Sequence, residues 1–125
     1  MIPGKHPSHP TFRRSFLFAM QGFRTAVRQE RNIKVMLGGA VFAVMAGVVC
    51  KLDLVSWAII VVCIGSVISS ELVNTSIEAV VDLVSPEFHP LAGKAKDIAA
   101  AAELVLSITA AIVGVLVYAN AIFFG

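Results

Sequence analysis

Three long apolar stretches most constrain what this chain can fold into. They cover residues 33–50, 54–83 and 98–124, and a helix needs about 20 apolar residues to cross a bilayer. Over its 125 residues the chain is 58% hydrophobic and only 14% charged, which is too apolar for an ordinary soluble domain. We therefore predict an all-α membrane protein with three transmembrane helices, built as a single domain over residues 1–125.

The segment Phe12–Arg31 has a different pattern. Its apolar residues recur at helical spacing, and the rest of its surface carries arginines. This pattern predicts an N-terminal amphipathic helix that lies in the membrane interface instead of crossing it. The segment is not a signal peptide, because charges interrupt its apolar face and no small-residue cleavage site follows.

The basic residues predict an orientation in the membrane. Seven of the ten lysines and arginines precede the first span or lie at its start. Two more, Lys94 and Lys96, lie between the second and third spans, and Lys51 lies between the first and second. Because cytoplasmic loops carry an excess of Lys and Arg, we expect the N-terminus and the loop over residues 83–97 to be cytoplasmic.

A stripe of four polar side chains lies on the second apolar stretch: Glu71, Asn74, Glu78 and Asp82. On a helix this spacing places all four within an arc of roughly 80°. Carboxylates in or beside hydrocarbon are costly and rarely face lipid. The stripe therefore points to bound cations or proton chemistry near the cytoplasmic end of the span. Because three spans enclose little, it also favours a homo-oligomer.

A second polar cluster lies on the same predicted side of the membrane. Its members are acids, lysines and a histidine: Glu30, Glu87, His89, Lys94, Lys96 and Asp97. Phosphoryl transfer uses such a mixture, since acids bind Mg²⁺, cations bind phosphate and one acid takes a hydroxyl proton. Nucleotide-binding loops of the Walker A or G-x-G-x-x-G type are absent from the sequence. The residues alone leave open a membrane enzyme with a cytoplasmic phosphate donor, a proton- or cation-coupled transporter, and a non-enzymatic membrane subunit.

The order of these polar residues resembles a known family. The run Glu71-Leu-Val-Asn-Thr-Ser-Ile-Glu-Ala-Val-Val-Asp82 is followed by Glu87-Phe-His89 and by Lys94-Ala-Lys-Asp97. From about Phe12 to the C-terminus the chain is similar to the small bacterial integral-membrane lipid kinases, diacylglycerol kinase and undecaprenol kinase. The run from Glu30 to Lys34, and the Leu-Val pair after Asp82, look like the undecaprenol kinase branch.

The resemblance implies an architecture and an activity. We expect a homotrimer of three-span protomers in the bacterial cell membrane, with active sites at the cytoplasmic interface that are shared between protomers. ATP with Mg²⁺ would enter from the cytoplasm, and a membrane lipid alcohol would enter from the bilayer. The expected acceptor is undecaprenol, with diacylglycerol as the alternative, and no nucleic-acid partner is expected.

The resemblance also implies roles for individual residues. Glu71 would be the general base, and Asn74 would support the reacting groups. Glu30 and Glu78 would hold Mg²⁺. The nucleotide site would be built from these two metal ligands together with Phe18, Glu87, His89, Lys96 and Asp97.

The chain departs from the family at three positions. Thr11 stands where the diacylglycerol kinase branch has an arginine, and Phe18 stands where that branch has a tyrosine beside the nucleotide. Glu103 stands where an apolar residue is usual. It is expected either to pair with Lys96, seven residues earlier on the same helix face, or to have no function.

Overall fold

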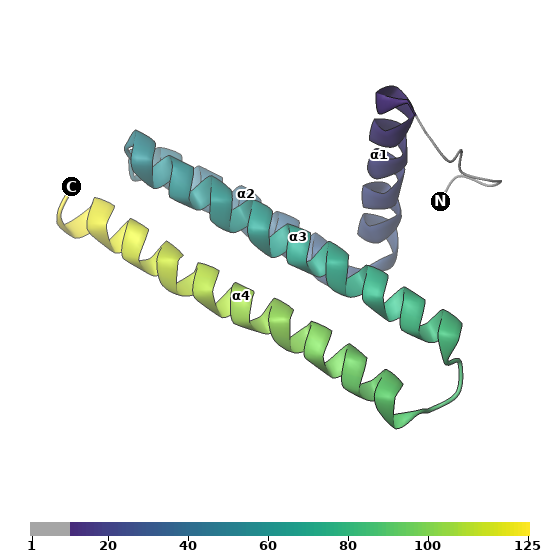
Figure 1. Cartoon of the computed structure of the whole chain (residues 1–125). Helices are drawn as coiled ribbons and strands as arrows, with labels where there is room; N and C mark the ends of the chain where they lie inside the picture. Colours follow the sequence, from purple (N-terminus) through teal and green to yellow (C-terminus); the bar gives the residue numbers. More distant parts are fainter. Residues whose placement is uncertain (1–10) are drawn as a thin grey trace.

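The computed structural model describes residues 11–125, and over this range it consists of four helices. They are α1 (Phe12–Gln29), α2 (Arg31–Val49), α3 (Leu54–Val84) and α4 (Pro90–Phe123). Helix α3 packs against both α2 and α4, and α1 stands steeply away from these three (Figure 1). The predicted all-α architecture, an N-terminal helix followed by three spans, is confirmed.

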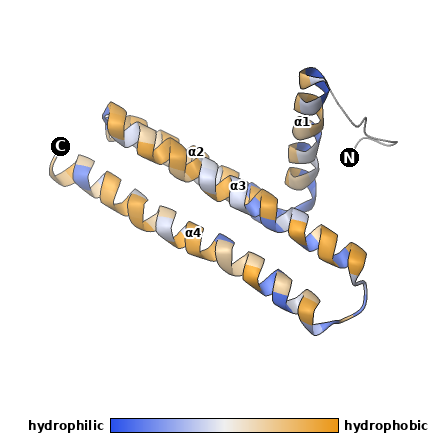
Figure 2. Cartoon of the chain, viewed as in Figure 1, coloured by the Kyte–Doolittle hydropathy of each residue, from blue (hydrophilic) through white to orange (hydrophobic). Residues whose placement is uncertain are grey.

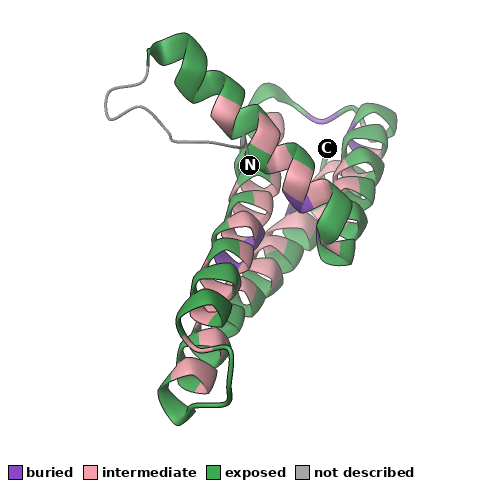
Figure 3. Cartoon of the chain, turned by 90° about the vertical axis from the view of Figure 1, so that its right-hand side faces the viewer, coloured by how far each residue is buried: buried purple, intermediate pink, exposed green. Residues whose placement is uncertain are grey.

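Helices α2, α3 and α4 are each long and apolar enough to cross a membrane. Hydrophobic residues dominate all three along their length (Figure 2). Most of their large apolar side chains lie on the outside, and the buried apolar residues of the described range are few: Ala26, Ile33, Leu52, Ile60 and Val117 (Figure 3). So much exposed apolar surface is unsuited to water and suits hydrocarbon. The chain is therefore a multi-pass membrane protein.

Helix α4 begins eight residues earlier than the third span predicted from the sequence. Pro90 occupies the first turn, and the Leu91 N–H donates to Nδ1 of His89 at 3.1 Å, which caps the helix. A proline here costs no hydrogen bond, since the first N–H groups of a helix have no partner within it. The loop expected over residues 83–97 is thus confined to 85–89.

The end of the bundle opposite that loop is held by a small apolar core and two polar contacts. Leu52, Ile60 and Val117 form the core, and the Tyr118 hydroxyl donates to the Ala43 carbonyl, joining α4 to α2. At the start of α3, the Ser56 N–H donates to Oδ1 of Asp53 at 2.7 Å. This bond lowers the pKa of the Asp53 carboxyl, so its stabilisation is present above the ordinary pKa and is lost as the pH falls through the lowered one.

Gly47 lets α2 approach this core, and its replacement should destabilise the bundle. A Cβ atom at this position would lie 2.7 Å from the ring of Trp57 and 3.0 Å from Leu52. We expect Gly47→Ala to reduce the free energy of unfolding in detergent by about 1–3 kcal/mol, as for other overpacked sites. The matched control is Gly38→Ala on the same helix, where nothing lies within 4 Å. Equal melting temperatures for the two variants would contradict this packing.

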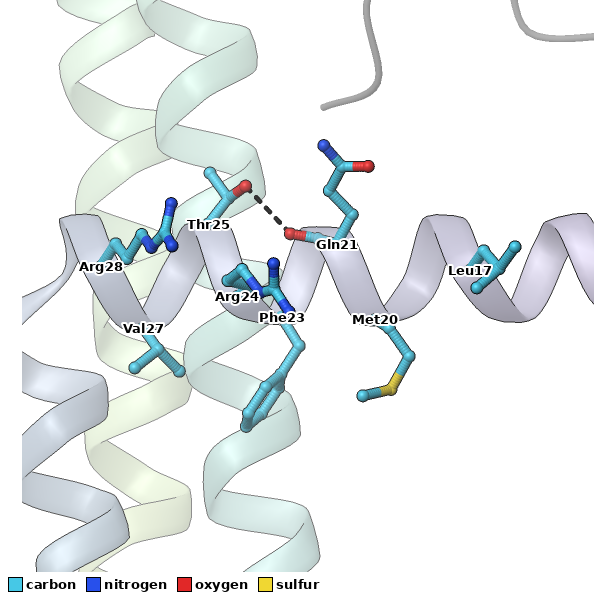
Figure 4. Close-up of a pocket in the computed structure, with 8 residues that line it drawn as sticks. All are labelled: Leu17, Met20, Gln21, Phe23, Arg24, Thr25, Val27 and Arg28. Atoms are coloured by element: carbon cyan, nitrogen blue, oxygen red, sulfur yellow. Dashed lines mark hydrogen bonds between the residues drawn. The ribbon is translucent and has the colours of Figure 1, made fainter.

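Helix α1 is amphipathic, as predicted, and ends two residues before the expected boundary. Its side chains Met20, Phe23 and Val27 point to one side, whereas Gln21 and Thr25 lie on another (Figure 4). The Arg14 N–H donates to the Thr11 hydroxyl at 3.3 Å and caps the first turn. An interfacial helix needs this division between a face for lipid and a face for water.

Candidate active site

Glu71 and Asn74 are the two buried polar residues in the described part of the chain. Their exposed fractions are 5% and 8%, although most side chains on these helices are half-buried or exposed. They lie three residues apart on α3, so they share one face of the helix. A buried polar side chain is costly unless it is paired or used. The face of α3 that carries Glu71 and Asn74 is therefore the candidate active site.

The side chains around Glu71 come from the α1–α2 junction and from α2, α3 and α4. The carboxylates of Glu30, Glu78 and Glu103 lie close enough to act on it electrostatically, and the Asn32 side chain lies within hydrogen-bonding reach. Glu30 sits between α1 and α2, Asn32 in the first turn of α2, Glu78 on α3 and Glu103 on α4. The fold thus gathers four carboxylates and an amide, and two of the carboxylates, Glu71 and Glu78, share α3.

Asn74 and Glu78 form the part of this cluster that suits a divalent cation. Asn74 Nδ2 donates to Oε1 of Glu78 at 3.3 Å, while Asn74 Oδ1 is buried without a hydrogen-bond partner. A buried oxygen left unpaired costs about 1–3 kcal/mol, and it is a ligand of the kind that Mg²⁺ prefers.

No group of three or more His, Cys, Asp or Glu side chains in residues 11–125 forms a ready metal cage. Mg²⁺ is usually held by one or two carboxylates together with phosphate oxygens and water. The carboxylates of Glu30 and Glu78 suit Mg²⁺ by their chemistry, and their assignment as metal ligands stays a prediction.

Four of the residues predicted to contact a nucleotide lie in or just after the α3–α4 loop, and the fifth, Phe18, lies on α1. Glu87, His89 and Asp97 are exposed, Lys96 is partly exposed, and Phe18 is half-buried on α1. Lys96 Nζ lies 2.5 Å from Oδ1 of Asp82, which joins the end of α3 to the start of α4. Asp82 is 11 residues beyond Glu71, or about 16 Å of helix rise. Lys96 therefore lies on the loop side of Glu71, although it is close enough to Glu78 to act on it electrostatically.

The pairing of Glu103 with Lys96, one of the two alternatives expected from the sequence, is wrong. Lys96 pairs with Asp82, and Glu103 Oε1 instead accepts a hydrogen bond from the Ser107 hydroxyl at 2.7 Å. Glu103 follows the start of α4 by 13 residues, and Glu71 precedes the end of α3 by 13. Since the two helices run antiparallel from one loop, these positions lie at the same level. Counting from the ends of α3 and α4 finds this pair only when the start of α4 at Pro90 is known, and nothing local in the sequence indicates Asn32.

Comparison with known proteins agrees with the motif. The sequence profile described as prokaryotic diacylglycerol kinase matches residues 17–118. The chain belongs to this family. The undecaprenol kinase of Bacillus subtilis is 38% identical over 107 residues, covering 86% of this chain and 87% of its own. The diacylglycerol kinase of Helicobacter pylori is 32% identical over 105 residues, covering 83% and 81%. That of Escherichia coli K12 is 30% identical over 95 residues, covering 76% and 78%.

Membership in the prokaryotic diacylglycerol kinase family decides between the functional classes that the residues left open. The matched relatives are named as kinases of lipids, and the match covers most of each chain. The chain is accordingly a lipid kinase, and the predicted enzyme class is confirmed. Kinases draw on a nucleotide and generally need a divalent metal to neutralise the charge of the phosphates.

Proposed function

We propose that the protein transfers the γ-phosphoryl group of ATP to the hydroxyl group of undecaprenol. The observation that carries the proposal is Glu71, a buried carboxylate on a membrane-spanning helix with three further carboxylates close by. A lipid alcohol presents its hydroxyl group at the membrane interface, and a base for that group must lie at the same level. The long exposed apolar faces of α2 to α4 support entry of the acceptor from the bilayer.

In this proposal Glu71 is the general base. The alcohol O–H bond breaks and its proton moves to the Glu71 carboxylate, while the alcohol oxygen bonds to the γ-phosphorus and the bond to ADP breaks. Asn32, within hydrogen-bonding reach, would hold one carboxylate oxygen and leave the other for the proton. Asn74 would support the reacting groups from the adjacent turn.

Glu30 and Glu78 would hold Mg²⁺, which when bound neutralises the charge of the phosphates and orients them. Because these two residues come from different segments, the pair exists only in the folded protein. Glu87, His89, Lys96 and Asp97 would contact the nucleotide at the α3–α4 loop, and Phe18 would do so from α1. We place this end of the bundle in the cytoplasm of a bacterial cell, where ATP is available, and the protomers in a homotrimer with shared sites.

The choice of undecaprenol rests on two observations. The relative that is 38% identical over 107 residues is named undecaprenol kinase. In addition, Phe18 and Thr11 offer fewer hydrogen-bond donors than the residues of the diacylglycerol branch. Diacylglycerol brings ester carbonyls that need donors, whereas a polyprenol suits an apolar wall. Diacylglycerol remains the second candidate, since the Helicobacter and Escherichia relatives are named diacylglycerol kinases.

Comparing acceptors in the same mixed micelles tests the substrate. We expect kcat/KM to be at least about tenfold higher for undecaprenol than for diacylglycerol, a difference of ~1.4 kcal/mol. Glycerol should be a very poor acceptor, because it lacks the chain that holds a hydroxyl group at the interface. A clear preference for diacylglycerol would refute the choice of undecaprenol and leave the kinase assignment intact.

A further inference from the structure

Glu103 is an ionisable side chain on a membrane-spanning helix that has no part in the roles proposed above. It is half-buried, and one of its carboxylate oxygens, Oε1, accepts the hydrogen bond from Ser107. Charged side chains within spans are costly and commonly mark functional positions. The Ser107 hydroxyl holds the carboxylate in place and leaves Oε2 available.

Glu103 belongs to a polar layer that lies one helical turn beyond the end of an apolar groove. The groove lies between α2, α3 and α4, has a volume of about 620 Å³, and ends at Val35, Ile68 and Ser107. One helical turn beyond these three residues lie Asn32, Glu71 and Glu103, one from each helix. The two carboxylates therefore stand at the same end of the same groove, and the electrostatic contact between them agrees with this placement.

The burial of Glu71 creates a difficulty for repeated turnover. After each transfer Glu71 carries the proton of the alcohol, and with 5% of its surface exposed it has little direct contact with water. An amide such as Asn32 takes no proton at neutral pH. Glu30 and Glu78 would be bound to metal, and carboxylate ligands are deprotonated. Of the groups close to Glu71, this leaves Glu103.

We propose that Glu103 takes the proton from Glu71 after each phosphoryl transfer and passes it to water. The inference rests on the proposed function and adds one step to it. In that step the proton leaves the Glu71 carboxyl group, binds the free oxygen of Glu103, directly or through one water, and then leaves to solvent. Both carboxylates end the cycle ionised, and no other reactant is needed. Glu103 acts through Glu71 and does not touch the lipid.

The test separates the first turnover from the steady state. The full-length protein in undecaprenol micelles is mixed rapidly with ATP and Mg²⁺, and lipid phosphate is measured from milliseconds onward. For Glu103→Gln we expect a first turnover within about twofold of the parent rate and a steady-state rate at least about tenfold lower, because general acid–base steps contribute factors of this size or more. Formate, a small proton acceptor, should restore the steady-state rate of Glu103→Ala. The control Thr109→Val, on the same helix, should keep both rates.

Three outcomes would overturn the proposal. One is an unchanged steady-state rate in Glu103→Gln. Another is an equal fall in both phases, which would place Glu103 in the chemistry or in the packing. The third is a steady-state rate of Glu103→Ala that does not respond to formate. If Glu103→Gln does not fold, Glu103→Ala without formate is measured against the same two rates, and a loss confined to the steady state is again required. A parent protein that phosphorylates no lipid alcohol would refute the proposed function itself, a result distinct from all three.

Discussion

Replacing Glu71 by glutamine should lower kcat by a factor of about 10²–10⁴, the usual contribution of a positioned general base. The substitution keeps the shape of the side chain and removes its ability to take a proton. Because Glu71 would act on the acceptor hydroxyl group and not on the nucleotide, the affinity for ATP should be largely kept. Steady-state kinetics with undecaprenol, together with titration of a fluorescent ATP analogue, measure the two quantities.

The matched control for this experiment is Asp53→Asn. It makes the same change from acid to amide at the opposite end of α3, where the side chain caps the helix, and it should leave kcat unchanged. Near-normal turnover of Glu71→Gln would refute the role of base. Loss of folding in Glu71→Gln alone would show that the buried carboxylate has a structural role.

Replacing Glu78 by glutamine should raise the Mg²⁺ concentration needed for half-maximal activity by roughly 10–100-fold. Losses of metal affinity of this size are typical when residues around a bound metal are replaced. The new amide oxygen can still accept the hydrogen bond from Asn74 Nδ2, so the local packing should survive. What is lost is the negative charge that would attract the metal. Glu30→Gln should act in the same direction, because Glu30 approaches Glu71 from the α1–α2 junction.

Magnesium titrations of both variants and of Asp53→Asn measure this effect. The control should superimpose on the parent, and the two glutamine variants should shift to higher Mg²⁺ concentration with weaker binding of MgATP. If the titrations of Glu78→Gln and Glu30→Gln superimpose on the parent while kcat falls, neither residue holds the metal.

Helix positions were largely predictable because they depend on local patterns. The length of each apolar stretch gave the three spans, and the spacing of charged residues separated α1 from them. The start of α4 differs from the prediction, because the charged residues Lys94, Lys96 and Asp97 are typical of a loop and yet lie within the helix. A helix of 34 residues is about 51 Å long, well beyond the hydrocarbon layer of about 30 Å. Charged turns can therefore extend into water without ending the helix.

The candidate site was predictable only where it lies within one helix. Glu71 and Asn74 follow from the helical period, which places them on one face whatever packs against it. Asn32 and Glu103 reach Glu71 only through the packing of α2 and α4 on α3, and their partners are 39 and 32 residues away in the sequence. Such pairs depend on how neighbouring helices align with one another. The periodic pattern within one helix carries no information about that alignment. The roles of Glu87 and His89 rest on the family resemblance alone.

The transfer of labelled phosphate from ATP to lipid tests the central claim most directly. The full-length protein is reconstituted in vesicles containing undecaprenol, supplied with ATP labelled at the γ-position, and the lipid fraction is separated and counted. The account predicts label in undecaprenyl phosphate that requires Mg²⁺, requires the lipid alcohol and falls at least about 10²-fold in Glu71→Gln. Unlabelled lipid, whether ATP is left intact or is hydrolysed to free phosphate, would contradict it.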